Sequence, residues 1–235
     1  FDLMSHITKH FFIILVSIFC NFSLCNEPED LQYISVLDKP SFSITSSERQ
    51  IILTGESSSS LNGSEFTIQI PSFKLNSNKL LVNINSKEAI YNKNIGFIKF
   101  KDSAELEALN KKDKLIISSE EITLNLTNET FSSVQDVLTN LNNLEIKSLG
   151  IEMTQKAGNL HAEFSEGAFQ IRNIGSISKG YAKKLYIISE DNKIILEEDA
   201  LLDQDGFIIK SDLIHYDYSL NKILKSINSS IENNS

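Results

Sequence analysis

Alternation of apolar and polar residues predicts an all-β protein, and three observations support that prediction. From about Leu31 onward, apolar residues recur with a period of two rather than 3.6. The runs are rich in Ile, Leu, Phe, Val, Thr and Ser, as expected for pleated, half-buried strands. Polar breaks separate the runs, and similar strand–turn–strand segments recur along the chain.

Length and composition set the scale of this fold. The chain has 235 residues, 41% of them hydrophobic, which allows one large domain or two small ones with a real core. The net charge is −9 and the lysines are scattered, so no nucleic-acid partner is expected. Apolar content is too ordinary for a disordered chain. No apolar run reaches the roughly 20 residues of a spanning helix, which excludes a polytopic membrane protein.

The N-terminal segment differs from the rest of the chain. Residues 11–25 read FFIILVSIFCNFSLC and follow a weakly positive stretch. We expect residues 1–25 to be a signal peptide, cleaved after Cys25, so that the bulk of the protein is exported to the periplasm. A short uncleaved membrane anchor facing the periplasm is the alternative. Both cysteines, Cys20 and Cys25, lie here, so neither a disulfide framework nor a zinc site is expected in the remaining chain.

Individual strands and turns can be placed by this alternation. Clear strand patterns occur at 66–70, 97–100, 122–126 and 162–164, and polar turns at 61–64, 111–113, 157–159 and 203–206. The segment SAELEALN, at 103–110, could form a helix, but its position between two strand-like runs favours a strand. A helix at 132–138 is a less favoured alternative to extended structure.

An internal repeat is the strongest feature. The copies are FIIKSDLIHY (207–216), LEIKSLGIEM (144–153), LIISSEEITL (115–124) and a weaker FTIQIPSFKL (66–75). A strand in each clear copy ends in a small polar residue, after which the apolar pattern shifts. Ile117 and Ile122 are five positions apart, so strict alternation cannot keep both on one face, and a β-bulge or corner is expected between them. Stacked units would bury one continuous core.

The repeat extends through both halves of the chain, which predicts one continuous domain over 31–225. The segment 173–178 is the best candidate for a soft joint within it. The polar residues 226–235 are expected to form a flexible tail.

Residues 178–223 carry a family resemblance. This run, SKGYAKKLYIISEDNKIILEEDALLDQDGFIIKSDLIHYDYSLNKI, resembles the C-terminal repeats of the LptA family of lipopolysaccharide-export proteins. The matching positions are Gly180, Ala182, Tyr186, Ala200, Gly206, Ile209, Asp212, Ile214 and Tyr216. The middle, 102–169, resembles the related LptC family in its order of elements.

The resemblance covers roughly residues 40–225 and implies the fold of the OstA-like superfamily. That fold is a β-jellyroll, an open twisted groove of antiparallel strands. One departure is that Glu197 or Glu198 replaces the usual Gly before the Ala-bearing strand. An LptA-like and an LptC-like role both remain open, because the leader and the last part suit the first family and the middle suits the second.

An apolar groove would suit long acyl chains, because they lack directional groups and are held by burial of CH2 surface at about 0.8 kcal/mol each. The resemblance therefore implies a lipopolysaccharide carrier that holds acyl chains in its groove. The candidate lining is Ile98, Phe100, Ile117, Ile122, Ile146, Ile151, Phe164, Leu185, Ile194, Leu196, Ile209 and Ile214. The alternative is that these residues are only the core of a closed sandwich.

The resemblance also implies partners. Unpaired edge strands, near Phe42–Leu53 and Leu213–Ile223, would join other bridge proteins head to tail, including a possible homo-oligomer. The bridge would run from an inner-membrane transporter complex to an outer-membrane translocon.

Catalysis has little support in the sequence, and neither a cofactor nor a metal site is expected. His161 and His215 have no metal-binding spacing, and Glu197–Asp199 is better explained as a solvated loop than as a cation site. The protein is therefore not expected to be an enzyme. The second hypothesis is a non-catalytic structural all-β repeat protein of the cell envelope, and an envelope hydrolase ranks last.

Overall fold

The structure is a computed structural model that describes residues 35–60, 62–77, 80–110, 113–156, 159–173 and 176–233. These residues belong to one compact unit. The predicted signal peptide, 1–25, and the first residues of the predicted domain lie outside them. Among the described residues, no helix has the length and hydropathy needed to cross a membrane.

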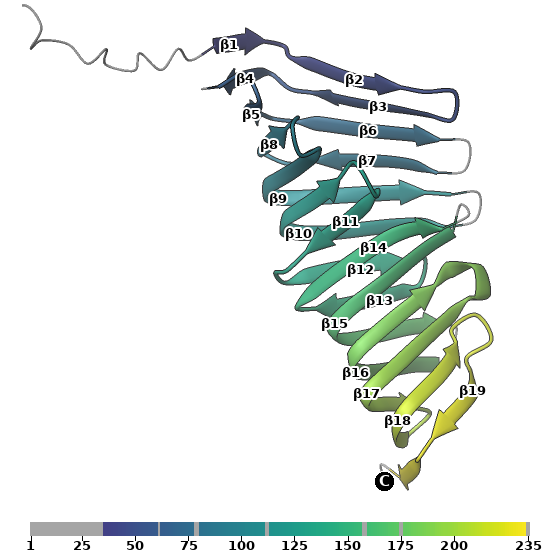
Figure 1. The fold of residues 1–235 in the computed structure, drawn as a ribbon. Helices are drawn as coiled ribbons and strands as arrows, with labels where there is room; N and C mark the ends of the chain where they lie inside the picture. The colour runs from purple at the N-terminus through teal and green to yellow at the C-terminus, as the bar shows by residue number, and fades with distance from the viewer. Residues whose placement is uncertain are drawn as a thin grey trace, which may run out of the picture. The chain divides into compact units, whose positions relative to one another are not determined.

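The described chain is antiparallel β-structure, as the alternation predicts. In chain order the strands are β1 (Ser35–Asp38), β2 (Ser41–Thr45), β3 (Arg49–Thr54), β4 (Ser57–Ser60), β5 (Glu65–Gln69), β6 (Ser72–Ser77), β7 (Leu81–Asn85), β8 (Glu88–Asn92), β9 (Phe97–Leu109), β10 (Lys114–Asn125), β11 (Thr130–Ser133), β12 (Val137–Leu141), β13 (Leu144–Ser148), β14 (Gly150–Lys156), β15 (Asn159–Asn173), β16 (Ser176–Ile188), β17 (Lys193–Gln204), β18 (Phe207–Asp217), β19 (Lys222–Ile227) and β20 (Ser230–Asn233), with a 3-10 turn, η1 (Ser189–Asp191), after β16. Figure 1 shows the strands following one another from β1 to β19.

Strand pairing divides the fold into two walls. Sheet I has the order β1-β4-β5-β8-β9-β10-β11-β14-β15-β16-β17-β18-β19. Sheet II has the order β2-β3-β6-β7-β9-β10-β12-β13-β15-β16-β17-β18-β20. The long strands β9, β10 and β15–β18 belong to both sheets, because one half of each pairs in sheet I and the other half in sheet II. This arrangement is the predicted β-jellyroll.

The chain passes from one sheet to the other at bends along one side of the jellyroll. In β10 the register shifts between Ser119 and Glu121, which confirms the break predicted between Ile117 and Ile122. In β17 the shift coincides with positive φ angles at Glu198 and Asp199. A bulge lets a strand turn a corner, because its extra residue leaves the ladder unpaired.

The small polar residue of each clear repeat lies at such a bend. Ser119 Oγ lies 2.9 Å from Ser133 Oγ and donates to the carbonyl of Asp136. Ser148 Oγ donates to the carbonyl of Gly150, and Ser211 Oγ to that of Leu213. These hydroxyl groups satisfy carbonyls where the regular ladder is interrupted. The repeat therefore encodes the corner as well as the strand.

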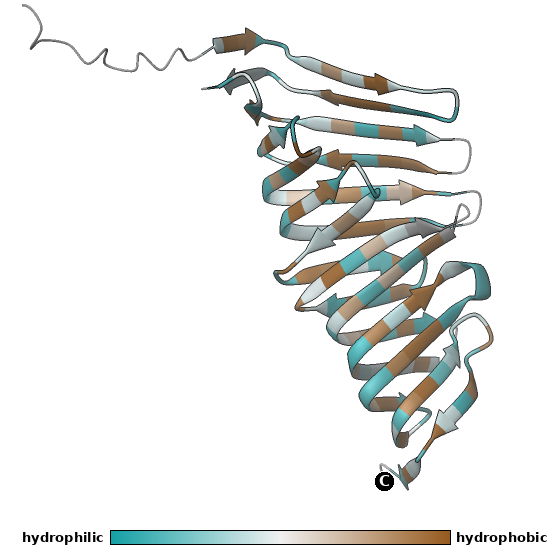
Figure 2. Ribbon diagram, viewed as in Figure 1, coloured by the Kyte–Doolittle hydropathy of each residue, from teal (hydrophilic) through white to brown (hydrophobic). Residues whose placement is uncertain are grey.

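Inward-facing apolar side chains fill the space between the sheets. Among the largest fully buried side chains are Phe73, Phe100, Phe164 and Tyr216. Figure 2 shows hydrophobic residues alternating with hydrophilic ones along the strands. Each buried Leu, Ile or Phe contributes about 1.5–3 kcal/mol relative to an exposed position. The core therefore lies between the two walls and continues through both halves of the repeat.

Gly180 shows why one position of the resemblance needs glycine. Gly180 pairs with Phe169 across the β15–β16 ladder. A Cβ at Gly180 would lie 2.3 Å from Cε1 of the Phe169 ring and 2.9 Å from the carbonyl oxygen of Leu201. The close approach of ring and backbone requires the missing side chain.

Several local predictions can be checked directly. The segments 103–110 and 132–138 contain strand and turn, so the strand prediction is confirmed for SAELEALN. The 203–206 turn is the β17–β18 hairpin, with positive φ at Asp205 and Gly206. The candidate joint at 173–178 lies at the β15–β16 hairpin, where Asn173 pairs with Ser176.

The C-terminal residues are paired. Within 226–235, expected as a flexible tail, β20 pairs with Phe207–Lys210 and the end of β19 with Leu213–Ile214. Main-chain hydrogen bonds do not depend on side-chain polarity, so a polar segment can still extend a sheet. The C-terminal edge consequently lies mostly beyond the predicted Leu213–Ile223, whereas the predicted N-terminal range, Phe42–Leu53, contains most of the edge strand β2. β1 and β2 form the N-terminal edge, and β19 and β20 the C-terminal edge.

Candidate lipid-binding interior

The twelve candidate lining residues all face the space between the sheets. Eleven of them are buried, and Ile209 is half-buried against the same cluster. Nine lie on sheet I: Ile98, Phe100, Ile122, Ile151, Phe164, Leu185, Ile194, Leu196 and Ile214. Ile117, Ile146 and Ile209 lie on sheet II. The structure thus brings the candidates into one cluster, and their contact with lipid remains a prediction.

Sequence reasoning missed most of the opposite wall. Buried residues of sheet II that face the candidates include Leu75, Ile84, Leu106, Leu144, Phe169, Ile171 and Leu202. Their signal is the same period-two alternation, in strands such as β6, β7 and β13. The sequence does not identify them as lining residues. A strand pattern reveals which residues share a face, but it does not reveal which strands face each other.

The interior is strongly apolar, with few polar side chains. Thr139 and Ser58 are buried with no hydrogen-bond partner for their hydroxyl groups. A buried hydroxyl without a partner costs about 1–3 kcal/mol. The described interior therefore offers mainly CH2 and CH3 surface, the chemistry that complements an acyl chain.

Burial decreases at the two ends of the jellyroll. At the N-terminal end, Ile44 pairs with the buried Ile51 and so faces inward, yet it is 43% exposed. At the C-terminal end, Ile231 pairs with Ile209 and is 69% exposed. The apolar interior therefore continues to both edges, where β1 and β2, and β19 and β20, leave it uncovered.

An aromatic cluster joins the sheets near the N-terminal end. The Phe42 ring, from sheet II, lies 5.0 Å from Phe66 and 5.3 Å from Tyr91, which belong to sheet I. All three side chains are half-buried. Burial raises the pKa of Tyr91, so the hydroxyl stays neutral at physiological pH.

We call the side of the jellyroll opposite the bends the mouth, because the hairpin turns of both sheets lie there. Turns of sheet I at 126–129 and 218–221 and turns of sheet II at 46–48 and 205–206 form its rims. Among the described residues, polar contacts join the rims at two places. Arg49 of sheet II forms an ion pair with Glu129 of sheet I. Asn221 of sheet I accepts a hydrogen bond from Ser178 of sheet II, at 2.7 Å.

A separate cavity of about 870 Å³ lies at the bends. Its lining includes outward-facing Leu138 and Lys147 of sheet II. Its carboxylates are Glu105, Glu120, Asp136 and Glu166. This acidic surface does not suit the phosphate groups of a lipid, so it is a poor candidate for the polar end of such a cargo.

The acidic run Glu197–Asp199 lies at the bend of β17. Lys183 pairs with Asp199 at 2.6 Å, and Lys184 with Glu198 at 2.5 Å. These side chains are largely exposed, so each pair contributes little to stability. The lysines neutralise the run locally, which agrees with a solvated corner.

His161 and His215 lie on the outer face of sheet I. Burial, together with Lys225 and Lys193, lowers the pKa of His215 and favours its neutral form. His161 borders a hollow of about 410 Å³ with Glu163 and Tyr186. Within the described ranges, no group of three or more His, Cys, Asp or Glu side chains could hold a metal ion.

Comparisons with known proteins show which family the chain resembles. Residues 47–162 match the family described as "Lipopolysaccharide-assembly, LptC-related". The match includes most of the 102–169 stretch that resembles LptC, and it starts well before it. The chain is therefore similar to this family over 116 of its 235 residues, which agrees with the resemblance to the LptA/LptC superfamily predicted from the sequence.

A solved structure similar to this chain is LptH from Pseudomonas aeruginosa, described as the LptA-homologous periplasmic component of the conserved lipopolysaccharide transport device. The two chains are 10% identical, with a TM-score of 0.39, and the similarity covers 64% of this chain and 93% of LptH. A search of curated protein sequences found no match.

Proposed function

We propose that this chain binds the acyl chains of lipopolysaccharide between sheets I and II and passes them along a head-to-tail bridge from the inner to the outer membrane. One observation carries the proposal. The apolar interior runs the length of the described jellyroll and reaches both unpaired edges, in a chain whose residues 47–162 match the LptC-related family. The role needs no catalytic residue.

Acyl chains would compete with the side chains that fill the interior. Each methylene withdrawn from water contributes about 0.8 kcal/mol, so several methylenes can offset the separation of two packed side chains. The lining has no directional groups to fix one position along the chain. Such an interior can hold a lipid while allowing it to slide.

The edges supply the proposed joints of the bridge. β1 and β2 at one end and β19 and β20 at the other are short strands with exposed residues on both faces. Pairing of the N-terminal edge with the C-terminal edge of a neighbour would extend both sheets. It would also cover Ile44 and Ile231, which are exposed at the ends.

The proposed location is the periplasm, reached through the N-terminal signal, with an inner-membrane anchor as the alternative. The proposed partners are lipopolysaccharide, neighbouring bridge proteins, the inner-membrane transporter complex and the outer-membrane translocon. The bridge geometry also permits a head-to-tail homo-oligomer.

Photo-crosslinking in living cells tests the proposal. A photoreactive residue replaces Ile146 or Leu196, which are buried between the sheets, and a third variant carries it at outward-facing Lys183. We expect lipopolysaccharide adducts at the two inner positions and none at the outer one. Folded variants with no adduct at either inner position would contradict lipid carriage.

The side chains that fill the interior favour a second candidate function, that of a non-catalytic structural repeat protein of the cell envelope. Phe100, Phe164 and Leu196 are fully buried by neighbouring side chains, as in an ordinary core. Under this alternative the same crosslinking experiment yields only protein–protein adducts.

A further inference from the structure

The cargo that we propose would have two incompatible parts. Acyl chains can lie between the sheets, but a charged, sugar-bearing headgroup cannot, because burial of charge in an apolar interior is very costly. The headgroup must therefore project through the mouth while the chains lie inside. Side chains that join the two rims stand in its path.

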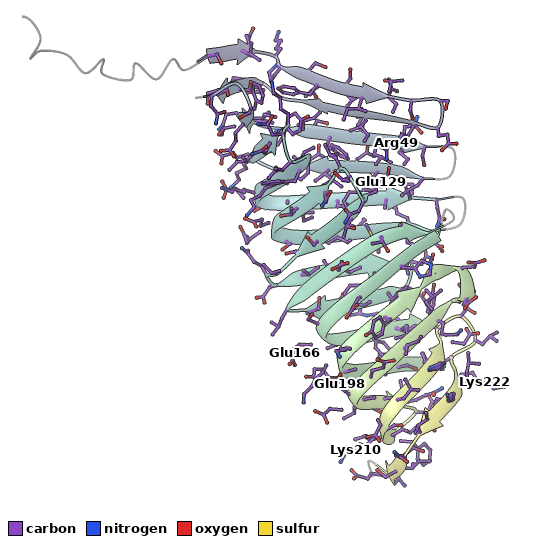
Figure 3. All side chains as sticks on the ribbon, in the orientation of Figure 1. Arg49, Glu129, Glu166, Glu198, Lys210 and Lys222 are labelled. Atoms are coloured by element: carbon purple, nitrogen blue, oxygen red, sulfur yellow. The ribbon has the colours of Figure 1, made fainter. Side chains whose placement is uncertain are left out.

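Arg49 and Glu129 form one such bridge. Arg49 shares the inward face of β3 with Ile51 and Leu53. Glu129 is the last residue of the 126–129 turn, directly precedes β11 and has a positive φ angle. Their ion pair thus joins the 46–48 turn of sheet II to the 126–129 turn of sheet I. Figure 3 labels both residues, which lie next to each other in that view.

Asn221 forms a second bridge of different character. Its side-chain oxygen accepts hydrogen bonds from Ser178 and Tyr216, and its carbonyl accepts one from Gln204 at 2.8 Å. Ser178 and Tyr216 are buried, at 1% and 0% exposure. Several partly buried hydrogen bonds act together here, whereas the Arg49–Glu129 pair is single and its side chains are 36% and 29% exposed.

We infer that the Arg49–Glu129 ion pair is a latch across the mouth, which must open before the headgroup of a lipid can pass the N-terminal half of the jellyroll. The inference rests on the proposed function. A partly exposed ion pair is weak and is screened by salt, so it can open on each passage.

A reversible cross-link tests the latch. Arg49→Cys and Glu129→Cys are combined in a Cys20→Ser, Cys25→Ser background and joined by a short bis-methanethiosulfonate linker, which a reductant cleaves. A direct disulfide is less suitable, because it requires Cα atoms within about 7 Å. Loading of fluorescent lipopolysaccharide into the purified full chain is then measured by stopped-flow fluorescence.

The matched control is Lys183→Cys with Asp199→Cys, joined by the same linker. This pair is also an ion pair, with side chains 51% and 68% exposed, but it lies at the bends rather than across the mouth. We expect the latch cross-link to abolish loading and reductant to restore it, while the control cross-link leaves loading unchanged.

Charge variants provide an independent measurement. Arg49→Gln or Glu129→Gln should load about two- to fivefold faster than the native chain, as expected for loss of an exposed ion pair. The reversed pair, Arg49→Glu with Glu129→Arg, should restore the native rate. Added salt should accelerate the native chain and leave the glutamine variants unchanged.

The outcomes separate this inference from the proposed function. Equal loading of the cross-linked and native chains would overturn the latch and leave lipid binding intact, with access through the open ends. No loading of the native chain, together with no lipopolysaccharide adduct at Ile146 or Leu196, would overturn both.

Discussion

The N-terminal region, β1–β8, and the C-terminal region, β15–β18, build the same two walls in different ways. In the first region each crossing between the sheets is a break between strands of four to six residues. In the second, strands of 11 to 15 residues bend and continue into the other sheet.

Proline explains part of this difference. Pro40 separates β1 from β2, and Pro71 separates β5 from β6. Proline has no N–H group for the ladder, and the residues before it, Lys39 and Ile70, have positive φ angles. No proline follows Pro71 in the sequence. The C-terminal strands can therefore turn their corners with bulges alone.

The interior is similar in both regions. In the N-terminal region, Phe73 and Ile84 are fully buried, and in the C-terminal region Phe164 and Leu185 are fully buried. The two regions therefore differ in how their corners are built rather than in whether a buried core is present.

The largest expected effect comes from the core. Phe164→Ala should lower the free energy of unfolding by about 3–5 kcal/mol, because a fully buried ring leaves a cavity. Phe42→Ala, at a half-buried ring, should cost about 1–2 kcal/mol. Urea denaturation followed by circular dichroism measures both. Equal losses would show that the two regions are equally well packed.

The next largest expected effect is a loss of folding stability at alkaline pH, caused by Tyr218 near the C-terminal end. Burial, with Asp113 and Asp217 nearby, raises the pKa of Tyr218 to about 12. Because the unfolded chain releases this proton near pH 10, stability is full below pH 10 and falls by about 2–3 kcal/mol as the pH rises toward 12.

Tyr218→Phe should remove this loss between pH 10 and 12. It should change stability little at pH 7, because the Tyr218 hydroxyl has no hydrogen-bond partner. Thermal unfolding at both pH values provides the test. An unchanged alkaline loss in the variant would assign that loss to other groups.

Gly180→Ala should destabilise the chain by about 1–3 kcal/mol, because the new methyl group would overlap the Phe169 ring. Phe169→Leu in the same chain should recover part of the loss. Differential scanning calorimetry of the single and double variants measures the coupling. Strictly additive effects would contradict a direct contact.

The smallest expected change in stability concerns two buried serines, Ser211 and Ser58. Ser211 donates to the carbonyl of Leu213 and accepts from the N–H of Ile227, so Ser211→Ala should cost about 1–2 kcal/mol. Ser58 has no partner, so Ser58→Ala should be neutral or slightly stabilising. Chemical denaturation distinguishes these outcomes. A clear loss of stability in Ser58→Ala would contradict the absence of a hydrogen-bond partner for this hydroxyl group.

Much of the fold could be predicted locally. The alternation identifies strands such as β9 and β10, and the spacing of Ile117 and Ile122 predicts the bend between them. Asp205 and Gly206 mark a hairpin by turn chemistry alone. These features depend on residues close in the chain, which is why a single sequence reveals them.

The two-wall arrangement was not predictable in the same way. Arg49 and Glu129 are 80 positions apart, and no periodicity relates them. Residues such as Phe169 and Ile171 were missed for the same reason, although their alternation is clear. The pairing of β20 was missed because a polar sequence carries no sign of main-chain hydrogen bonding.

The sequence by itself determined that the chain is all-β, that its units repeat, and where its corners lie, because side-chain alternation and turn residues act over a few positions. Only the tertiary structure decided which strands form each wall, which apolar residues face each other and which polar residues meet across the mouth. Those contacts depend on how distant strands pair and twist in space, and this information is absent from any short stretch of the chain.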